Sequence, residues 1–389
     1  MNKYFLLVGV TVRALAQAAA RAGYAPCAID GFADRDTLAA CVGRALRLPM
    51  RGATPDWPRL DEAICDMRRH YARRGFAGAV AGGGLEACPE LLDLLAEHAP
   101  PANAAKAAVL AAATPARWFA LLDEIGAPHP KVSLRDTPKG PGWLVKRAGG
   151  TGGLHVRPWR RGAARAPGDY FQQRAPGRPA SALFLAADGE ARIVGWQRPL
   201  VAPTAALPYR YGGVVCDDAL PIRAKASIAA VIERLARRLP LRGLAGLDCL
   251  IDGEAVQVLE LNPRPTASIA LYPALNLFSL HLEACAGRLP DAPLLHDWRP
   301  CGEAVLYAAT PLAVPADFRW PPHCADLPTG AAEFAPGEPV CSVRCSADST
   351  QALLTKLQRR TMALSSKLED THDTESQRAG RAAGRLAVC

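Results

Sequence analysis

Strand-like and helix-like segments alternate along the first hundred residues, and this alternation constrains the fold more than any other feature of the chain. Tyr4–Val10 and Ala25–Ile29 are typical of apolar strands, and a helix is predicted between them from about Val12 to Ala22. A longer helical stretch, Trp57–Arg74, precedes another apolar strand at Phe76–Val80. Strands connected through helices form parallel sheets. The sequence therefore predicts a parallel α/β domain that binds ligands at the carboxyl ends of its strands.

The composition narrows the classes of molecule that the protein is expected to bind. Lys and Arg number 46 against 37 Asp and Glu, a formal net charge of +9 that suits nucleic acid, a membrane surface or small anions. The basic residues are spread out and no basic stretch is interleaved with aromatic residues, so we expect no nucleic-acid partner. The most apolar stretch, Ala104–Ile125, is broken by charged residues and Pro115, so we expect no membrane span.

The N-terminus and the cysteines indicate the cellular compartment in which we expect the protein. Met1–Val10 followed by Ala16-Gln17-Ala18 resembles a short signal peptide, but Arg13 interrupts the apolar segment, so we expect a cytoplasmic protein. The 12 cysteines include no CxxC pair and no His/Cys cluster, which favours free thiols in a reducing compartment and predicts no zinc site.

A glycine-rich loop follows a strand that ends in a lysine. Trp143–Lys146 leads into Gly149, Gly150, Gly152 and Gly153, after which a second strand is expected at Leu154–Pro158. Glycines let a backbone fold its N–H groups around phosphate oxygens, and Lys146 would add a positive charge. The loop matches neither a Walker A motif nor GxGxxG. Taken alone, such a hairpin tip is more often only a turn.

Three oxygen-bearing side chains converge in a second motif. Asp252-Gly253 predicts a tight turn between two apolar strands, which lets Asp248 lie across from Glu260. Asn262 shares the face of Glu260 because side chains on a strand repeat every two residues. Oxygen-only ligation of this kind suits Mg²⁺ or Mn²⁺ together with nucleotide phosphates. The alternative is that this strand simply ends in solvent.

Together, and in this order, the two motifs resemble those of the ATP-grasp carboxylate–amine/thiol ligases. The resemblance extends from Met1 to about Leu368, and Glu260–Pro265 is its most specific part. It implies an α/β and α+β architecture, the ATP-grasp fold. The implied parts are a pre-ATP-grasp α/β domain at 1–100, an ATP-grasp N-lobe at 101–170 and a C-lobe with the metal site at 171–290. A small β-rich region and helix at 291–368 and a flexible tail at 369–389 follow.

The same resemblance assigns roles to individual residues. It implies ATP and two Mg²⁺ (or Mn²⁺) ions as cofactors, with the ions bound by Asp248, Glu260 and Asn262. Lys146 is similar to the lysine that contacts the nucleotide, and Gly149–Gly153 to the lid over the phosphates. The segment Tyr170–Arg174, with Gln172 and Gln173, is similar to the adenine-binding hinge. Catalytic roles on the transferred phosphoryl group or the substrate carboxylate fall to Arg264, Arg198 and Arg210.

The sequence departs from the family pattern at two places. Many members have an acidic hinge residue where Gln173 falls. Many also have a second phosphate-binding lysine just before Pro115, where this chain has Ala113 or Thr114. Either Lys106 or Arg117 replaces that lysine, or α-phosphate binding is weaker.

The resemblance implies an ADP-forming ligase that makes an amide bond through an acylphosphate. Gly9–Leu15, Asp30–Thr37, Ser181–Phe184, Arg210–Gly213 and the Cys301–Ser346 region resemble a subgroup that joins the γ-carboxylate of L-glutamate to tyramine or tyrosine in methanofuran or methylofuran biosynthesis. We therefore expect small-molecule partners, glutamate as donor and an amine as acceptor, and leave a homodimer open. A ligase that adds an amino acid to a pterin and a non-catalytic ATP sensor remain alternatives.

Overall fold

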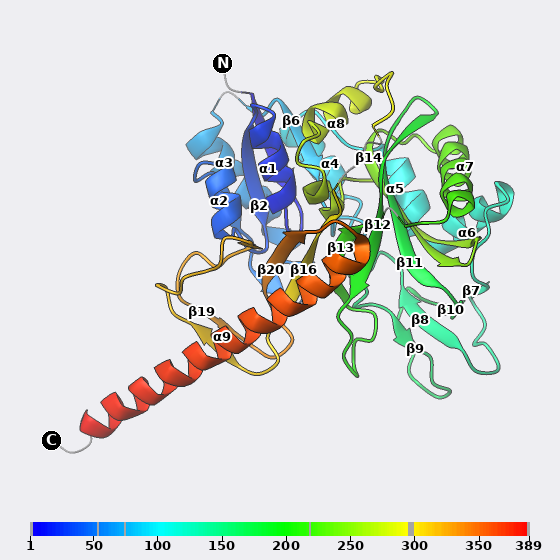
Figure 1. The fold of residues 1–389 in the computed structure, drawn as a ribbon. Helices are drawn as coiled ribbons and strands as arrows, with labels where there is room; N and C mark the ends of the chain where they lie inside the picture. Colours follow the sequence, from blue (N-terminus) through cyan, green and yellow to red (C-terminus); the bar gives the residue numbers. More distant parts are fainter. Residues whose placement is uncertain (1–2, 53, 74, 218, 295–298, 387–389) are drawn as a thin grey trace.

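The computed structural model describes residues 3–52, 54–73, 75–217, 219–294 and 299–386, with side chains through His372. Its N-terminal part is a four-stranded parallel sheet of order β3-β2-β1-β6 with helices packed against it (Figure 1). All six residues of β2 are buried, as expected for a parallel strand covered on both faces. The predicted parallel α/β region is confirmed. Its elements are β1 (Tyr4–Val8), α1 (Arg13–Arg21), β2 (Ala25–Asp30), α2 (Arg35–Ala40), β3 (Ala45–Arg47), α3 (Leu60–Tyr71), β6 (Gly78–Ala81) and α4 (Leu91–His98), with the short pair β4 (Met50–Arg51) and β5 (Thr54–Pro55) and the 3₁₀ helix η1 (Trp57–Arg59) inserted before α3.

The next part of the chain is a helical pair followed by a small antiparallel sheet of order β7-β10-β8-β9. The glycine-rich loop connects its strands β8 and β9. The second of these is shorter than predicted, because turns continue through Val156, whose backbone N–H donates to the Gly153 carbonyl. The elements are α5 (Lys106–Ala113), α6 (Pro115–Glu124), β7 (Val132–Ser133), β8 (Trp143–Arg147), β9 (Arg157–Pro158) and β10 (Asp169–Gln173).

A large antiparallel sheet of order β15-β14-β11-β12-β13-β16-β20-β18 forms the centre of the molecule. Alternate side chains of β11 enter two different hydrophobic clusters: Phe184 packs with α7, and Leu183 packs with α8 and the N-terminal domain. Burial on both faces explains why β11 is almost wholly apolar. The elements are β11 (Arg178–Ala187), β12 (Glu190–Val201), β13 (Tyr211–Cys216), α7 (Ile222–Arg238), β14 (Gly243–Asp252), β15 (Ala255–Asn262), η2 (Ala267–Leu271) and α8 (Leu277–Cys285).

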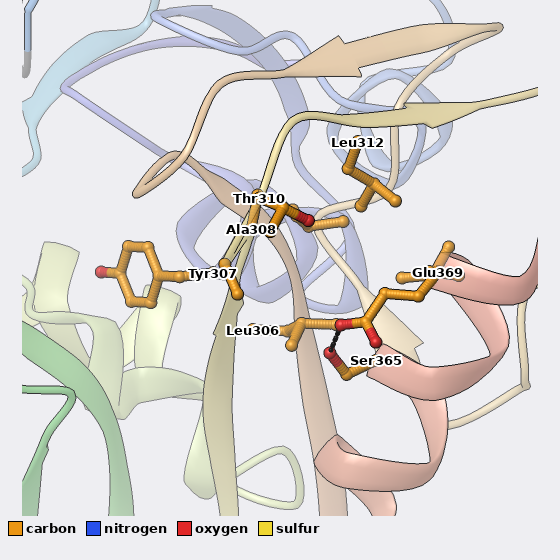
Figure 2. Close-up of a pocket in the computed structure, with 10 residues that line it drawn as sticks. Leu306, Tyr307, Ala308, Thr310, Leu312, Ser365 and Glu369 are labelled. Carbon is orange, nitrogen blue, oxygen red and sulfur yellow. Dashed lines mark hydrogen bonds between the residues drawn. The ribbon is translucent and has the colours of Figure 1, made fainter. Parts of the chain in front are cut away.

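The C-terminal strands extend this central sheet, and a long helix then crosses it and projects away from the rest of the molecule (Figure 1). The helix α9 runs to Leu386, beyond the end predicted near Leu368, and the flexibility of the segment from Glu369 stays a prediction. A small pocket lies between β16, β17 and α9, where the Ser365 hydroxyl donates to Glu369 (Figure 2). The elements are β16 (Cys301–Tyr307), β17 (Leu312–Val314), β18 (Cys324–Ala325), β19 (Ala332–Phe334), β20 (Pro339–Ser346) and α9 (Thr350–Leu386).

No helix in the described part of the chain combines the length and hydrophobicity needed to cross a bilayer.

Candidate active site

The side chains predicted to bind a metal ion lie on one face of the β14–β15 hairpin. The hairpin turns at Gly253 and Glu254, one residue later than predicted, and Gly253 has a φ of +58°, which side chains other than glycine rarely adopt. The register places Asp248 opposite Glu260. Asn262 lies two residues further along β15 and so shares this face. The predicted pairing of Asp248 with Glu260 is confirmed, but it depends on a register shift between Asp248 and Cys249 that was not predicted. Metal binding by these side chains stays a prediction.

The two carboxylates destabilise each other in their present surroundings. Burial raises the pKa of Asp248 well above its usual range, and the neighbouring charge of Glu260 raises it further. The Asn262 amide donates to Asp248 Oδ2 at 3.0 Å. A divalent cation between the carboxylates would remove their repulsion, and the donor set consists of oxygen atoms only. These residues therefore fit an ion such as Mg²⁺ or Mn²⁺.

Lys146 brings a positive charge from the smaller sheet toward these carboxylates. It lies on β8 directly opposite Tyr170 of β10, and its side chain is buried. Burial lowers the pKa of its ammonium group, whereas the negative charges of Glu260 and Asp248 act in the opposite direction. Lys146 and the two carboxylates thus belong to one electrostatic cluster between the two sheets.

The glycine-rich loop is packed against two distant segments. Gly149 and Gly153 have φ values of +69° and +71°. A Cβ on Gly149 would lie 2.7 Å from the Cα of Ala87, and one on Gly153 would overlap the Tyr209 carbonyl. The Tyr211 N–H also donates to the Gly152 carbonyl at 2.9 Å. Glycine is therefore required here both for the backbone conformation and for the close approach of neighbouring backbones.

Arg264 is held by an acidic residue of the N-terminal domain that the sequence analysis missed. Its Nε donates to Glu86 Oε1, and one terminal nitrogen donates to the Asn262 side-chain oxygen at 3.0 Å. Glu86 in turn accepts the Gly84 N–H at 2.7 Å. Because 178 residues separate Glu86 from Arg264, the only signal in the sequence is an acidic residue just after a triple glycine at a strand end.

A small pocket beside Arg264 lies where β6 ends. Glu86, Asn103 and Pro263 are among the residues that line it. Asn103 accepts the backbone N–H of Ala81, the last residue of β6, at 2.6 Å. The pocket therefore lies at the carboxyl end of a strand of the parallel sheet, where the alternation of strands and helices predicts ligand binding.

The two hinge glutamines point in different directions. Gln172 lies two residues from Tyr170, so it shares the face of the sheet that carries Lys146. It is buried, and its amide Nε2 has no hydrogen-bond partner. Gln173 lies on the other face and is exposed. Of the two glutamines, only Gln172 therefore lies on the same face of the sheet as Lys146.

Arg198 and Arg210 form ion-pair and stacking contacts away from Asp248 and Glu260, and their predicted roles toward the substrate carboxylate or the γ-phosphate stay predictions. Gln197 lies in register with Ser181, which pairs with Asp248, so Arg198 occupies the opposite face of the sheet. There it forms an ion pair with Asp217 at 3.1 Å.

Arg210 stacks on the Tyr307 ring, 3.6 Å from its centroid. Its guanidinium donates to the carbonyls of Ala202 and Gly337. These contacts fasten the loop before β13 to the C-terminal region.

The predicted replacements for a second phosphate-binding lysine lie at the surface. Lys106 forms an ion pair with Asp93 of α4. Arg117 is exposed on α6. Neither is in contact with Lys146, Asp248 or Glu260 among the described interactions, and whether either replaces the phosphate-binding lysine stays open.

Comparisons with known proteins agree with this geometry. Residues 117–268 match the ATP-grasp domain family. The biotin carboxylase domain of Hydrogenobacter thermophilus 2-oxoglutarate carboxylase, solved as a dimer with MgADP, ADP and bicarbonate, is similar in structure with a TM-score of 0.70 at 14% identity, over 92% of this chain and 89% of that chain. A search of the curated proteins finds no match.

Two further solved structures are similar over nearly their whole length. N5-carboxyaminoimidazole synthetase from Staphylococcus aureus, complexed with ADP, has a TM-score of 0.65 at 12% identity, over 93% of this chain and 98% of that chain. L-amino acid ligase from Bacillus licheniformis has a TM-score of 0.63 at 13% identity, over 95% of this chain and 97% of that chain. Residues 117–268 therefore match the ATP-grasp domain family, and the chain as a whole has the ATP-grasp fold.

Proposed function

We propose that this protein is an ATP-dependent, ADP-forming ligase that activates a carboxylate as an acylphosphate and transfers the acyl group to an amine. The observation that carries the proposal is the cluster formed by Lys146, Asp248 and Glu260 between two sheets, with Arg264 beside it. Cations and oxygen ligands gathered in one place are what a bound nucleoside triphosphate needs.

Each residue would have a separate task in the reaction. Lys146 would bind phosphate oxygens, and Arg264 would stabilise the charge that develops on the transferred phosphoryl group. Divalent ions bound by Asp248, Glu260 and Asn262 would supply electrostatic stabilisation of the phosphates. The loop Gly149–Gly153 would cover the phosphates and keep water from hydrolysing the acylphosphate.

At a finer level, we propose that the donor is the γ-carboxylate of L-glutamate and the acceptor is tyramine or tyrosine, as in methylofuran biosynthesis. This rests on the sequence resemblance of Asp30–Thr37 and Arg210–Gly213. Arg198 or Arg210 would bind the α-carboxylate of the glutamate. The pocket beside Arg264, at the carboxyl end of β6, is where we expect the carboxyl group of the acyl substrate to lie.

A carboxylase that activates bicarbonate in the same way is a second candidate. The carboxylases of similar fold favour it: the H. thermophilus domain was solved with MgADP and bicarbonate. Both candidates form ADP and phosphate, and they differ in the carboxylate that is required.

The test is a screen that measures ADP release with MgATP. Its arms contain glutamate with tyramine, glutamate with tyrosine, glutamate with a pterin, other amino-acid pairs, and bicarbonate. We expect release only with both a donor and an acceptor, and loss of release in Glu260→Ala. Glu254→Ala is the matched control, because Glu254 lies on the same hairpin but pairs with Arg223 at the surface. Full activity of Glu260→Ala, or no release in any arm, would contradict the proposal.

A further inference from the structure

Three side chains that commonly bind metal ions meet where two helices of the N-terminal domain lie side by side. Asp61 and Cys65 are four residues apart on α3, so they share one face of that helix. His98 is the last residue of α4. One ligand atom of each side chain lies within 4.8 Å of those of the other two. The expectation of no zinc site rested on neighbours in the sequence, whereas 37 residues separate Asp61 from His98.

The two helices hold these side chains on a rigid base. Leu60 and Ile64 of α3 and Leu95 of α4 are buried in the same hydrophobic cluster. Nε2 of His98 lies 2.7 Å from Oδ1 of Asp61, and the histidine side chain is only 14% exposed. The imidazole and the carboxylate are therefore already directed toward each other, which is the kind of preorganisation that a metal site needs.

The donor set of nitrogen, sulfur and oxygen suits zinc. Zn²⁺ binds imidazole, thiolate and carboxylate in tetrahedral sites at about 2.0–2.3 Å, which places the ligand atoms about 3.3–3.7 Å from one another. The contact between His98 and Asp61 would open slightly, and the Cys65 sulfur would move by about 1 Å at most. Asp61 and Cys65 are exposed, so rotation of their side chains allows this adjustment.

The surroundings leave these side chains accessible to a cation. Among the cysteines in the described residues, only Cys65 is exposed. Arg59 and Arg69, which flank the three side chains along the chain, are paired with Glu62 and Asp66. These two positive charges are therefore already balanced by acidic neighbours.

We propose that Asp61, Cys65 and His98 form a zinc-binding site that fastens α3 to α4, with a water molecule as the fourth ligand. On binding, the Cys65 thiol releases its proton to solvent and binds as the thiolate, and His98 binds as the neutral imidazole with its proton on the other nitrogen. No electron is transferred. The site does not depend on the proposed function, because none of its residues belongs to the candidate active site.

Cobalt and zinc titrations of the full chain test the site. Metal-free, reduced protein is titrated with Co²⁺ and followed by absorption, because a cobalt–thiolate bond gives a charge-transfer band and tetrahedral cobalt gives intense visible bands. We expect both signals, saturating at one Co²⁺ per chain. Zn²⁺ should displace the cobalt with a dissociation constant in the micromolar range or tighter, because tetrahedral sites with a thiolate ligand favour zinc.

Variants identify the ligands. Cys65→Ser should abolish the charge-transfer band, and Cys65→Ser, Asp61→Asn and His98→Gln should each weaken zinc binding at least tenfold, because loss of a direct ligand costs no less than loss of a residue that supports one. Asp66→Asn and His70→Ala are the matched controls. They remove an acid and a histidine from the same helix outside the site, and both should bind zinc as wild type does.

Three results would overturn the proposal. They are the absence of the charge-transfer band in the wild-type protein, its persistence in Cys65→Ser, and zinc binding only in the millimolar range, where exposed carboxylates and imidazoles bind the ion without a built site.

Glu260→Ala separates this site from the proposed function. The cobalt signals should persist in this variant even if it no longer releases ADP. Their loss would place the metal in the candidate active site and overturn the assignment to Asp61, Cys65 and His98.

Discussion

Replacing Glu86 with Ala tests whether the N-terminal domain positions Arg264. The side chains of Glu86 and Arg264 are 14% and 16% exposed, so their ion pair is neither fully buried nor at the surface. Breaking a buried pair costs about 3–5 kcal/mol, whereas an exposed pair is worth about 0–1 kcal/mol. Glu86 also accepts the Gly84 N–H. We expect the free energy of unfolding to fall by about 2 kcal/mol.

The catalytic effect should be larger than the effect on stability. Without Glu86, Arg264 is free to leave the position beside Asn262, and loss of one preorganised donor to a developing charge costs about 100-fold or more in kcat. Glu86→Gln keeps an acceptor for Gly84 and Arg264 and should retain more activity than Glu86→Ala. Urea unfolding and steady-state ADP release measure the two effects.

Asp93→Ala provides the control for this prediction. Asp93 also pairs with a cation, Lys106, but its side chain is 62% exposed. We expect it to change stability by less than about 1 kcal/mol and to leave kcat unchanged. A kcat for Glu86→Ala within twofold of the wild-type value, in protein that is folded, would refute the positioning role.

Three further predictions concern the loop, the nucleotide and pH. Gly153→Ala should weaken MgATP binding at least tenfold by calorimetry, whereas Gly162→Ala, with a φ of +85° but open space around it, should not. Lys146→Met should abolish MgATP binding in the same assay, while Lys106→Met, which removes an exposed lysine, should bind normally. Burial lowers the pKa of His281 to about 4. Between about pH 6.5 and 4 the unfolded chain binds the proton and the folded one does not, so this group should cost roughly 2 kcal/mol of stability by pH 5. His281→Asn should show a smaller fall in urea-unfolding free energy between pH 7 and pH 5, and an equal fall would contradict the assignment.

Local patterns in the sequence predict the elements that carry the site. Asp252-Gly253 predicts the hairpin, and the two-residue repeat predicts that Glu260 and Asn262 share a face. The place of Asp248 opposite Glu260 also needs the register shift between Asp248 and Cys249, which no local pattern indicates. Likewise, the alternation of strands and helices predicts the parallel N-terminal sheet. These predictions succeed because they depend on residues that are close to one another in the sequence.

Contacts between distant segments are not predictable in this way. Asp217 draws Arg198 to the far face of the sheet, and Tyr307 holds Arg210, although nothing near either arginine in sequence indicates these partners. The pairing of Glu86 with Arg264 is hidden for the same reason. Where α9 ends was also mispredicted, because the polar composition after Glu369 is equally compatible with an exposed helix.

A crystal structure of the protein with MgADP tests the central claim most directly. We predict a magnesium ion between the carboxylates of Asp248 and Glu260, with the diphosphate lying between Lys146 and the loop Gly149–Gly153. A nucleotide bound elsewhere, or a magnesium ion on the diphosphate that neither carboxylate contacts, would contradict the claim that this site binds and activates ATP.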